Sequence, residues 1–182
     1  MSSDSFFYNL GDQLWAGRRA YGADPIQTAA SQLGLASATG IPTGELVGQL
    51  ASPEELKRLY AANPRAFERN FWLAGDNVNM AIGQAQTVVT PLELAQAYAS
   101  FANGGTIWQP RLVSRVLGVD GSVAKDYPPV EKGKIPTSAA NIAVIQQALV
   151  QVTTTATGTA TSVFTGFNPT VAGKTGTAEQ AK

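Results

Sequence analysis

The order of structural patterns along the 182-residue chain predicts an α+β fold with an antiparallel sheet. Several helical patterns occupy the first half of the chain. Two short strand patterns follow, and then one more helix and one more strand. No internal repeat or linker divides the sequence, and its length is sufficient for one domain with a sizeable core.

The first helix is predicted from regularly spaced apolar residues behind a capping residue. Phe7, Leu10 and Leu14 share one helical face, which predicts a helix over residues 5–19 with Asp4 as its N-cap. Further helices are expected to begin at Asp24-Pro25, Ser52-Pro53 and Thr90-Pro91, where proline follows a capping residue.

The helix after Thr90 is apolar around most of its circumference, so it is expected to be nearly buried. Its single polar stripe contains Glu93, Gln96, Ser100 and Asn103. The large apolar side chains of Leu94, Tyr98 and Phe101 lie off that stripe.

Strand patterns appear in the second half. Residues 111–119 and 123–127 flank Asp120-Gly121, a hairpin turn signal, and predict two paired strands. A helix is expected around Ile142 to Val152, capped near Thr137 or Ser138. Thr153 to Thr161 is rich in β-branched threonine and is expected to be a loop, and residues 171–178 are expected to form a last strand.

The composition excludes several functions. The sequence has no cysteine and no histidine, so thiolate nucleophiles, Ser-His-Asp triads and most catalytic zinc sites are excluded. A general base would have to be lysine, a carboxylate or tyrosine. The formal net charge of +0 offers no basic stripe for nucleic acid, and no apolar run reaches the length of a membrane helix.

The segment from Val171 to Ala178 has the chemistry of a ligand-binding strand. Glycine within a strand often marks a close approach by a ligand, Lys174 supplies a cation, and Thr175 and Thr177 supply hydroxyl donors. An extended anionic ligand would suit this edge. The alternative is an ordinary surface strand with one solvated lysine. In a pleated strand Lys174 and Thr175 would point to opposite faces, so a shared site would have to wrap around the edge.

Two motifs far apart resemble those of the penicillin-interacting serine enzymes: Ser2-Ser3-Asp4 before a helix, and Lys174-Thr175-Gly176. Between them, four stretches are similar to family signatures in order and spacing: Gly40 to Glu45, Gly83 to Ala95, Ala102 to Gly105, and Gly158-Thr159-Ala160. The chain closely resembles the class B penicillin-binding proteins, the membrane-anchored transpeptidases of bacterial cell-wall synthesis, and in particular the elongation-type branch.

The resemblance implies a β-lactamase/transpeptidase-like fold, in which an antiparallel sheet is flanked by a helical subdomain. Residues 1–182 would form part of that domain, with a helical side over about 5–105 and a sheet side over about 106–182, the sheet being incomplete. It also implies roles: Ser2, Asp4 and Lys174 as catalytic residues, with Ser2 and Lys174 in proton transfer. Thr175, Gly176 and Thr177 would bind the substrate, and the Thr177 N–H would contribute to an oxyanion hole. No cofactor and no metal are implied.

Asp4 stands where asparagine is commoner in the family. An ionised carboxylate only accepts hydrogen bonds, so the change alters what this position can bind. Its alternative role is that of helix cap, and the two roles are compatible. Ser2 could equally be an inert N-terminal residue.

The family's first motif, Ser-x-x-Lys, carries the nucleophilic serine at a helix start. The one match here, Ser122 to Lys125, follows a hairpin turn and lies downstream of Ser-x-Asp, so it is interpreted as a chance match. The nucleophile is then expected to precede Met1, the chain to be an excised piece, and the piece alone to be inactive.

Two functions remain open from the sequence. In the first, the parent is a D,D-transpeptidase that cross-links peptidoglycan stem peptides ending in D-Ala-D-Ala and is acylated by β-lactam antibiotics. In the second, the piece is a non-catalytic β-lactam-binding or assembly module. A class A β-lactamase fits the spacing less well. The resemblance further implies partners in a cell-wall synthesis complex, a role in cell shape or cell division, and a place on the extracytoplasmic face of the bacterial membrane.

Overall fold

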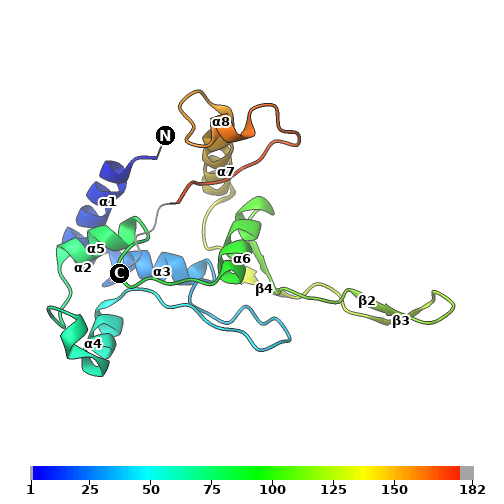
Figure 1. Ribbon diagram of the computed structural model, residues 1–182, viewed down its shortest axis with the longest axis horizontal. Helices are drawn as coiled ribbons and strands as arrows, with labels where there is room; N and C mark the ends of the chain where they lie inside the picture. The colour runs from blue at the N-terminus through cyan, green and yellow to red at the C-terminus, as the bar shows by residue number, and fades with distance from the viewer. Residues whose placement is uncertain (1, 177–182) are drawn as a thin grey trace.

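The computed structural model describes residues 2–176, in which helices dominate and four short strands form two antiparallel pairs (Figure 1). The helices are α1 (Asp4–Ala16), α2 (Arg18–Tyr21), α3 (Pro25–Gln32), α4 (Pro53–Ala62), the 3-10 helix η1 (Pro64–Ala66), α5 (Ala74–Ala81), α6 (Pro91–Ala102), α7 (Ala139–Thr154) and α8 (Thr161–Phe164). The strands are β1 (Thr106–Trp108), β2 (Arg115–Leu117), β3 (Val123–Asp126) and β4 (Glu131–Lys134). The predicted α+β composition with antiparallel pairing is confirmed.

Three helices begin where their capping residues predict. The side chain of Ser52 accepts a hydrogen bond from the Glu55 N–H at the start of α4, and the side chain of Ser138 accepts one from the Asn141 N–H at the start of α7. At α6, Thr90 and Glu93 form a reciprocal capping box, in which each side chain accepts from the other's backbone N–H. These caps satisfy N–H groups that a helix cannot pair internally.

The first helix differs from the prediction at both ends. Ser3, and not Asp4, is the N-cap residue, and its side chain makes no capping bond. Asp4 is the first helical residue, where its negative charge still favours the positive end of the helix dipole. The helix ends at Ala16 because Gly17 interrupts it, and the short helix α2 follows.

The main hydrophobic core lies beneath α1, α4 and α5. Its buried residues are Ala51, Leu56, Trp72 and Met80, with Trp15, Ile26, Leu50 and Phe67 packed around them. Helices α1 and α5 lie against each other, and the buried side chain of Asn77 donates to the Gly11 carbonyl across their contact at 2.7 Å. The two helices can approach this closely because Gly11 has no side chain: a Cβ there would lie 2.9 Å from the Ala81 Cβ.

Replacing Gly11 with alanine is therefore expected to destabilise the protein. A methyl group at Gly11 would overlap α5, and relieving the overlap should cost about 1–3 kcal/mol of unfolding free energy. Gly75, within α5, is the matched control because an added Cβ meets nothing within 4 Å. Gly75→Ala is expected to raise stability by about 0.5–1 kcal/mol. Urea unfolding of the two variants checks both signs, and equal effects would contradict the close contact.

Helix α6 was expected to be nearly buried, and this expectation is wrong: only Glu93, Gln96, Ala97 and Ser100 of the helix are buried. Glu93, Gln96 and Ser100 on the polar stripe are buried, with Glu93 only 1 % exposed, whereas Leu94 is 44 % exposed. The reason is that backbone groups of neighbouring segments depend on these side chains. The Glu93 carboxylate accepts from the Gly48 N–H at 2.9 Å and from the Thr90 N–H at 2.7 Å, and Gln96 donates to the Trp108 carbonyl at 2.8 Å.

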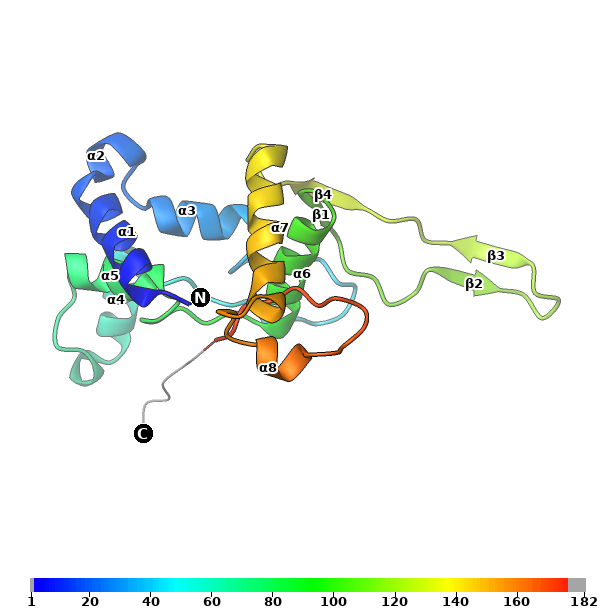
Figure 2. The same ribbon diagram turned by 90° about the horizontal axis from the view of Figure 1, so that it is seen from above.

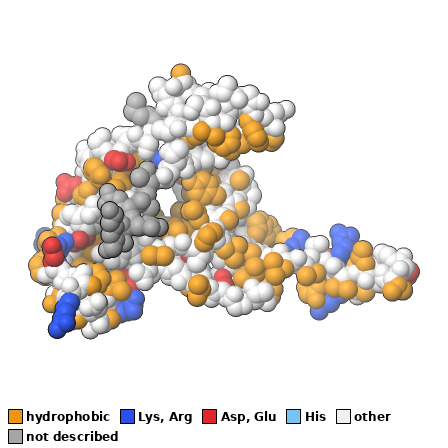
Figure 3. All heavy atoms as spheres, in the orientation of Figure 1, with side chains coloured by type: hydrophobic (Ala, Val, Ile, Leu, Met, Phe, Trp, Pro, Cys, Tyr) orange, Lys and Arg blue, Asp and Glu red, His pale blue; other side chains and the backbone are white. Residues whose placement is uncertain are grey.

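The four strands make one long ribbon that extends away from the helices (Figures 1 and 2). Strands β1 and β4 pair at its base, and β2 and β3 pair towards its tip, each pair with an irregularity in its register. The predicted hairpin around Asp120-Gly121 is confirmed. All residues of β2 and β3 are exposed, and hydrophobic side chains alternate with lysine and arginine along this arm (Figure 3).

The loop before α4 is fastened by one carboxylate. Glu45 accepts hydrogen bonds from the Thr39 N–H and hydroxyl and from the Gly40 N–H, at 2.7–3.0 Å. The bond from the Thr39 hydroxyl, followed by those from the two backbone N–H groups, lowers the pKa of Glu45 below its ordinary value of 4.5. Lys132 ties the same loop to β4 by donating to the Ala38 carbonyl at 2.5 Å.

This lowered pKa sets the sign of a pH dependence. Because the folded pKa lies below the unfolded one, the contribution of Glu45 is fully present above the ordinary pKa of 4.5 and is lost as the pH falls through the lowered folded pKa. Glu45→Gln is expected to remove this part of the acid dependence of unfolding, measured by urea denaturation between pH 6 and 3. A variant of the exposed Glu68, Glu68→Gln, should retain the slope, and an unchanged slope in Glu45→Gln would refute the assignment.

The end of the chain departs from two expectations. Helix α7 continues through Thr153, which is buried and donates to the Val150 carbonyl, and α8 follows the short loop. Residues 171–176 do not form the expected strand. They run along α7 instead, where the Gly173 N–H donates to the Leu149 carbonyl at 3.1 Å. Residues 177 and 178 of that expected strand lie outside the described part. Among residues 2–176, no helix has the length and apolarity to cross a membrane.

Candidate active site

The two ends of the described chain meet at Ser2 and Lys174. The Lys174 ammonium donates to the Ser2 hydroxyl oxygen at 3.0 Å and to the Thr175 carbonyl at 2.7 Å. Ser2 lies just before α1, and Lys174 lies in the segment that α7 holds through Gly173. Because Ser2 accepts from the ammonium, its own hydroxyl proton remains available for donation.

A second pair of hydroxyl groups lies beside this contact. The side-chain oxygens of Thr159 and Thr175 are 2.9 Å apart and form a hydrogen bond. This bond joins the loop that connects α7 to α8 with the segment 171–176. Thr159 was part of a recognised sequence signature but was not predicted as a site residue. A threonine fifteen positions before Lys174 gives no sign in the sequence that it contacts Thr175.

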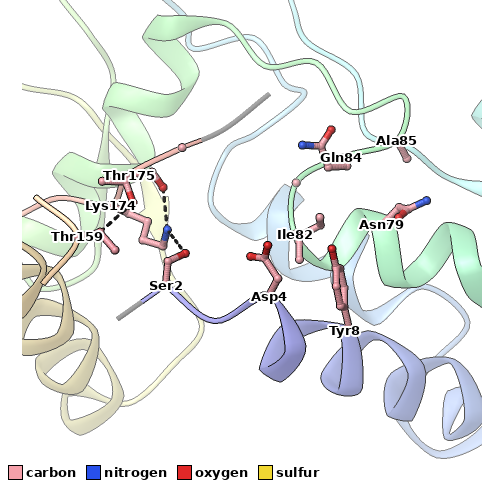
Figure 4. A pocket seen from close by; sticks show the side chains of 12 residues that line it. Ser2, Asp4, Tyr8, Asn79, Ile82, Gln84, Ala85, Thr159, Lys174 and Thr175 are labelled. Atoms are coloured by element: carbon pink, nitrogen blue, oxygen red, sulfur yellow. Dashed lines mark hydrogen bonds between the residues drawn. The ribbon is translucent and has the colours of Figure 1, made fainter. Parts of the chain in front are cut away.

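These residues form one wall of a cleft with a volume of about 980 Å³ (Figure 4). The cleft is lined by Ser2, Asp4, Tyr8, Asn79, Ile82, Gly83, Gln84, Ala85, Thr159, Lys174, Thr175 and Gly176. It therefore brings together Ser2, Asp4, Lys174, Thr175 and Gly176 from the predicted set. Thr177 lies outside the described residues.

The opposite wall contains residues that the sequence did not single out as a site. Tyr8 lies one turn after Asp4 on α1, so the helical spacing could have indicated it. Asn79 and Ile82 come from the end of α5, and Gly83 to Ala85 form the turn after it. Gly83 and Ala85 both have positive φ, 79° and 64°, and this conformation is uncommon for alanine. The turn directs the chain around the rim of the cleft.

Residues 171–176 have an irregular backbone, so Lys174 and Thr175 do not point to opposite faces as they would in a pleated strand. Lys174 and Thr175 both line the cleft, and their side chains lie on the same wall as Ser2. A cation and three hydroxyl groups are thus concentrated on this wall, an arrangement suited to binding a carboxylate and to passing a proton. Across residues 2–176, no group of three acidic side chains could hold a metal ion.

The Ser122 to Lys125 match has no helical geometry. Ser122 follows the turn of the exposed hairpin and donates to the Asp120 carboxylate at 2.7 Å, while Lys125 lies in β3 above the Tyr127 ring. The hairpin extends away from the helices (Figure 1), and neither Ser122 nor Lys125 lines the cleft. The expectation that no helix forms here is confirmed. Bonding to Ser122 also lowers the pKa of Asp120.

Comparisons with known proteins agree with this geometry. A family model described as "Penicillin binding protein transpeptidase domain" matches residues 1–182. The chain is 27 % identical over 181 residues to the peptidoglycan D,D-transpeptidase MrdA of Haemophilus influenzae, covering 98 % of this chain and 25 % of that protein. It is 27 % identical over 180 residues to MrdA of Acinetobacter baumannii, covering 98 % and 24 %. The chain therefore spans about a quarter of the length of these curated relatives.

Solved structures show the same fold. Penicillin-binding protein 2B of Streptococcus pneumoniae has a TM-score of 0.73 at 24 % identity, over 98 % of this chain and 29 % of that one. The D,D-transpeptidase domain of a peptidoglycan glycosyltransferase from Eggerthella lenta also has a TM-score of 0.73 at 24 % identity, over 100 % and 40 %. The expected transpeptidase-like fold is confirmed.

Proposed function

Because this chain belongs to the penicillin-binding protein transpeptidase family, we propose that it forms part of a peptidoglycan D,D-transpeptidase of the elongation type. The enzyme would cross-link stem peptides ending in D-Ala-D-Ala and would be acylated by β-lactams. Residues 1–182 would supply the second and third motifs of its active site, with the helical side over about 5–105 and the sheet side over about 106–182.

The observation that carries this proposal is the hydrogen bond between Lys174 and Ser2, residues 172 positions apart in the sequence. Such a contact between two motif residues is unexpected for an inert N-terminal serine and a solvated lysine. The cleft beside it is large enough for a short peptide, and its polar groups converge from several segments, as binding sites require.

The residues on the Lys174 wall of the cleft support separate roles in proton transfer and in substrate binding. A serine nucleophile would lose its proton to the lysine of its own Ser-x-x-Lys motif as it attacks the carbonyl of the penultimate D-alanine. The peptide bond then breaks, and terminal D-alanine leaves with a proton on its nitrogen. Lys174 and Ser2 would deliver that proton; their hydrogen bond supports this role, since the ammonium donates to the hydroxyl oxygen and leaves the hydroxyl hydrogen free. The amine of a second stem peptide then attacks the acyl carbonyl and releases the serine.

Substrate binding falls to the residues next to Lys174. The Thr175 hydroxyl, oriented by Thr159, would donate a hydrogen bond to the terminal carboxylate of the peptide. The charge of Lys174 would attract the same carboxylate, and Gly176, which has no side chain, would leave room for it. Thr177 would add a second hydroxyl and an oxyanion-hole N–H. A single oxyanion donor is worth about 10²–10³ in rate.

The nucleophile itself would come from outside the residues that line the cleft. Ser122 is excluded by its place on the hairpin, and Ser2 is engaged with Lys174. We therefore propose that a Ser-x-x-Lys segment other than Ser122 to Lys125 completes the site, and that the 182-residue chain alone is inactive.

The relatives support a proposal about partners and location. Solved relatives include a ceftriaxone acyl-enzyme complex of penicillin-binding protein A from M. tuberculosis and a complex of PBP2 with MreC from Helicobacter pylori. By analogy, β-lactams and proteins of a wall-synthesis complex would bind this protein, on the extracytoplasmic face of a bacterial membrane.

Labelling with a fluorescent penicillin tests the proposal. The whole gene product is expected to be labelled covalently at a Ser-x-x-Lys serine, and the isolated 182 residues are expected to remain unlabelled. Peptide mapping by mass spectrometry locates the adduct. Labelling at Ser122 would reverse the assignment of the nucleophile, and a whole gene product that resists labelling would favour a non-catalytic assembly module.

A further inference from the structure

The cleft carries one charge of each sign, on facing walls. Among the described residues that line it, Lys174 and Asp4 are the only charged side chains. Lys174 is directed to Ser2 and Thr175, whereas Asp4 projects from the start of α1 beside Tyr8 and Ile82 (Figure 4). Within residues 2–176, the Asp4 carboxylate has neither an ion pair nor a side-chain hydrogen bond, so it does not pair with Lys174.

The Asp4 carboxylate suits a hydrogen-bond donor of a ligand and not an acceptor. An ionised carboxylate only accepts hydrogen bonds, so a neutral amide carbonyl placed against it would find no donor. An ammonium group brings three donors and a positive charge. Tyr8 and Asn79, which line the cleft on the same wall, offer further oxygen atoms that can accept from it.

We propose that Asp4 is a specificity residue, which binds the ammonium group of ligands whose carboxylate binds at Lys174 and Thr175. This inference rests on the proposed function of the same cleft and adds the class of ligand. The preferred ligand carries both charges on one molecule, as do a D-alanyl peptide with a free amine near its acyl end and a penicillin with an amino group on its side chain.

Ampicillin and benzylpenicillin provide a matched pair of probes, because their side chains differ by one ammonium group. The measured quantity is the ratio of their second-order acylation rate constants on the whole gene product. Asp4→Asn is expected to lower the ratio of ampicillin to benzylpenicillin by up to about fivefold, the upper end of the range for an exposed ion pair. Raising the salt concentration from 0.05 to 0.5 M should reduce the preference of the wild type and leave that of Asp4→Asn unchanged.

Asp12→Asn is the matched control. Asp12 lies on the same helix and is exposed, but it does not line the cleft, so the variant removes the same charge without touching the site. Its ratio should equal that of the wild type. Asp4→Glu should keep part of the preference.

The outcomes distinguish a failure of the proposed role of Asp4 from a failure of the proposed transpeptidase function. If Asp4→Asn slows both penicillins equally, Asp4 does not recognise the ammonium and the inference is wrong, while the proposed function stands. The same holds if the ratio and both rates are unchanged. If the wild-type gene product is acylated by neither penicillin, the proposed function itself fails.

Discussion

Lys174→Met is expected to lower the rate of penicillin acylation of the whole gene product by about 10²–10⁴-fold. The variant keeps the length of the side chain but removes the ammonium that donates to Ser2 and to the Thr175 carbonyl. Without it the Ser2 hydroxyl loses its orientation and the wall loses its only cation among the described lining residues. Stopped-flow or gel-based measurement of the acylation rate constant gives the effect directly.

A double-mutant cycle distinguishes a shared role from two separate ones. If Ser2 and Lys174 act as a unit, Ser2→Ala combined with Lys174→Met should be little slower than the worse single variant. Lys125→Met is the control: Lys125 lies over the Tyr127 ring on the hairpin, so its loss should leave acylation unchanged. Multiplicative effects of Ser2→Ala and Lys174→Met would contradict the relay.

Glu93→Ala is expected to lower the unfolding free energy by about 3–5 kcal/mol. The carboxylate is 1 % exposed and holds the Gly48 and Thr90 N–H groups. Each buried N–H left without an acceptor costs about 1–3 kcal/mol, and the loss of the helix cap adds about 1 kcal/mol. Small domains have about 5–15 kcal/mol in total, so the change is severe.

The surroundings of Glu93 allow a graded test by urea denaturation. Glu93→Gln keeps one acceptor oxygen and should lose less than Glu93→Ala. Gly48→Ala should also disrupt the contact between Gly48 and Glu93 and destabilise the protein. A Cβ at Gly48 would lie 2.4 Å from the Val88 carbonyl oxygen and 2.6 Å from Glu93 Oε2. Glu54→Gln, on the exposed side of α4, is the control and should be within about 0.5 kcal/mol of the wild type. A small effect at Glu93 would show that water replaces the carboxylate.

The sequence predicts well those features that depend on neighbours in the chain. The starts of α4, α6 and α7 and the turn at Asp120-Gly121 each follow from a few adjacent residues, and all lie where they were predicted. The convergence of Ser2 and Lys174 was predicted by resemblance alone, since nothing local to either motif encodes a contact over 172 positions.

The errors arise where distant segments compete for the same groups. Helix α6 buries its polar stripe because Gly48 and Trp108, far away in the sequence, need its side chains as partners. Residues 171–176 follow α7 instead of forming a strand because the Leu149 carbonyl accepts from Gly173. Asn79 and Thr159 reach the cleft only through the packing of whole elements.

Because Gly11 has no side chain, the close packing of α1 on α5 affects how the cleft could adjust to a ligand. Since α1 and α5 are locked together there, Asp4, Tyr8 and Asn79 travel as one block. The facing wall is attached to α7, and within the cleft it meets this block through the bond between Lys174 and Ser2. Any change in the width of the cleft would therefore move one wall against the other, and a bound peptide would have to share Lys174 with Ser2.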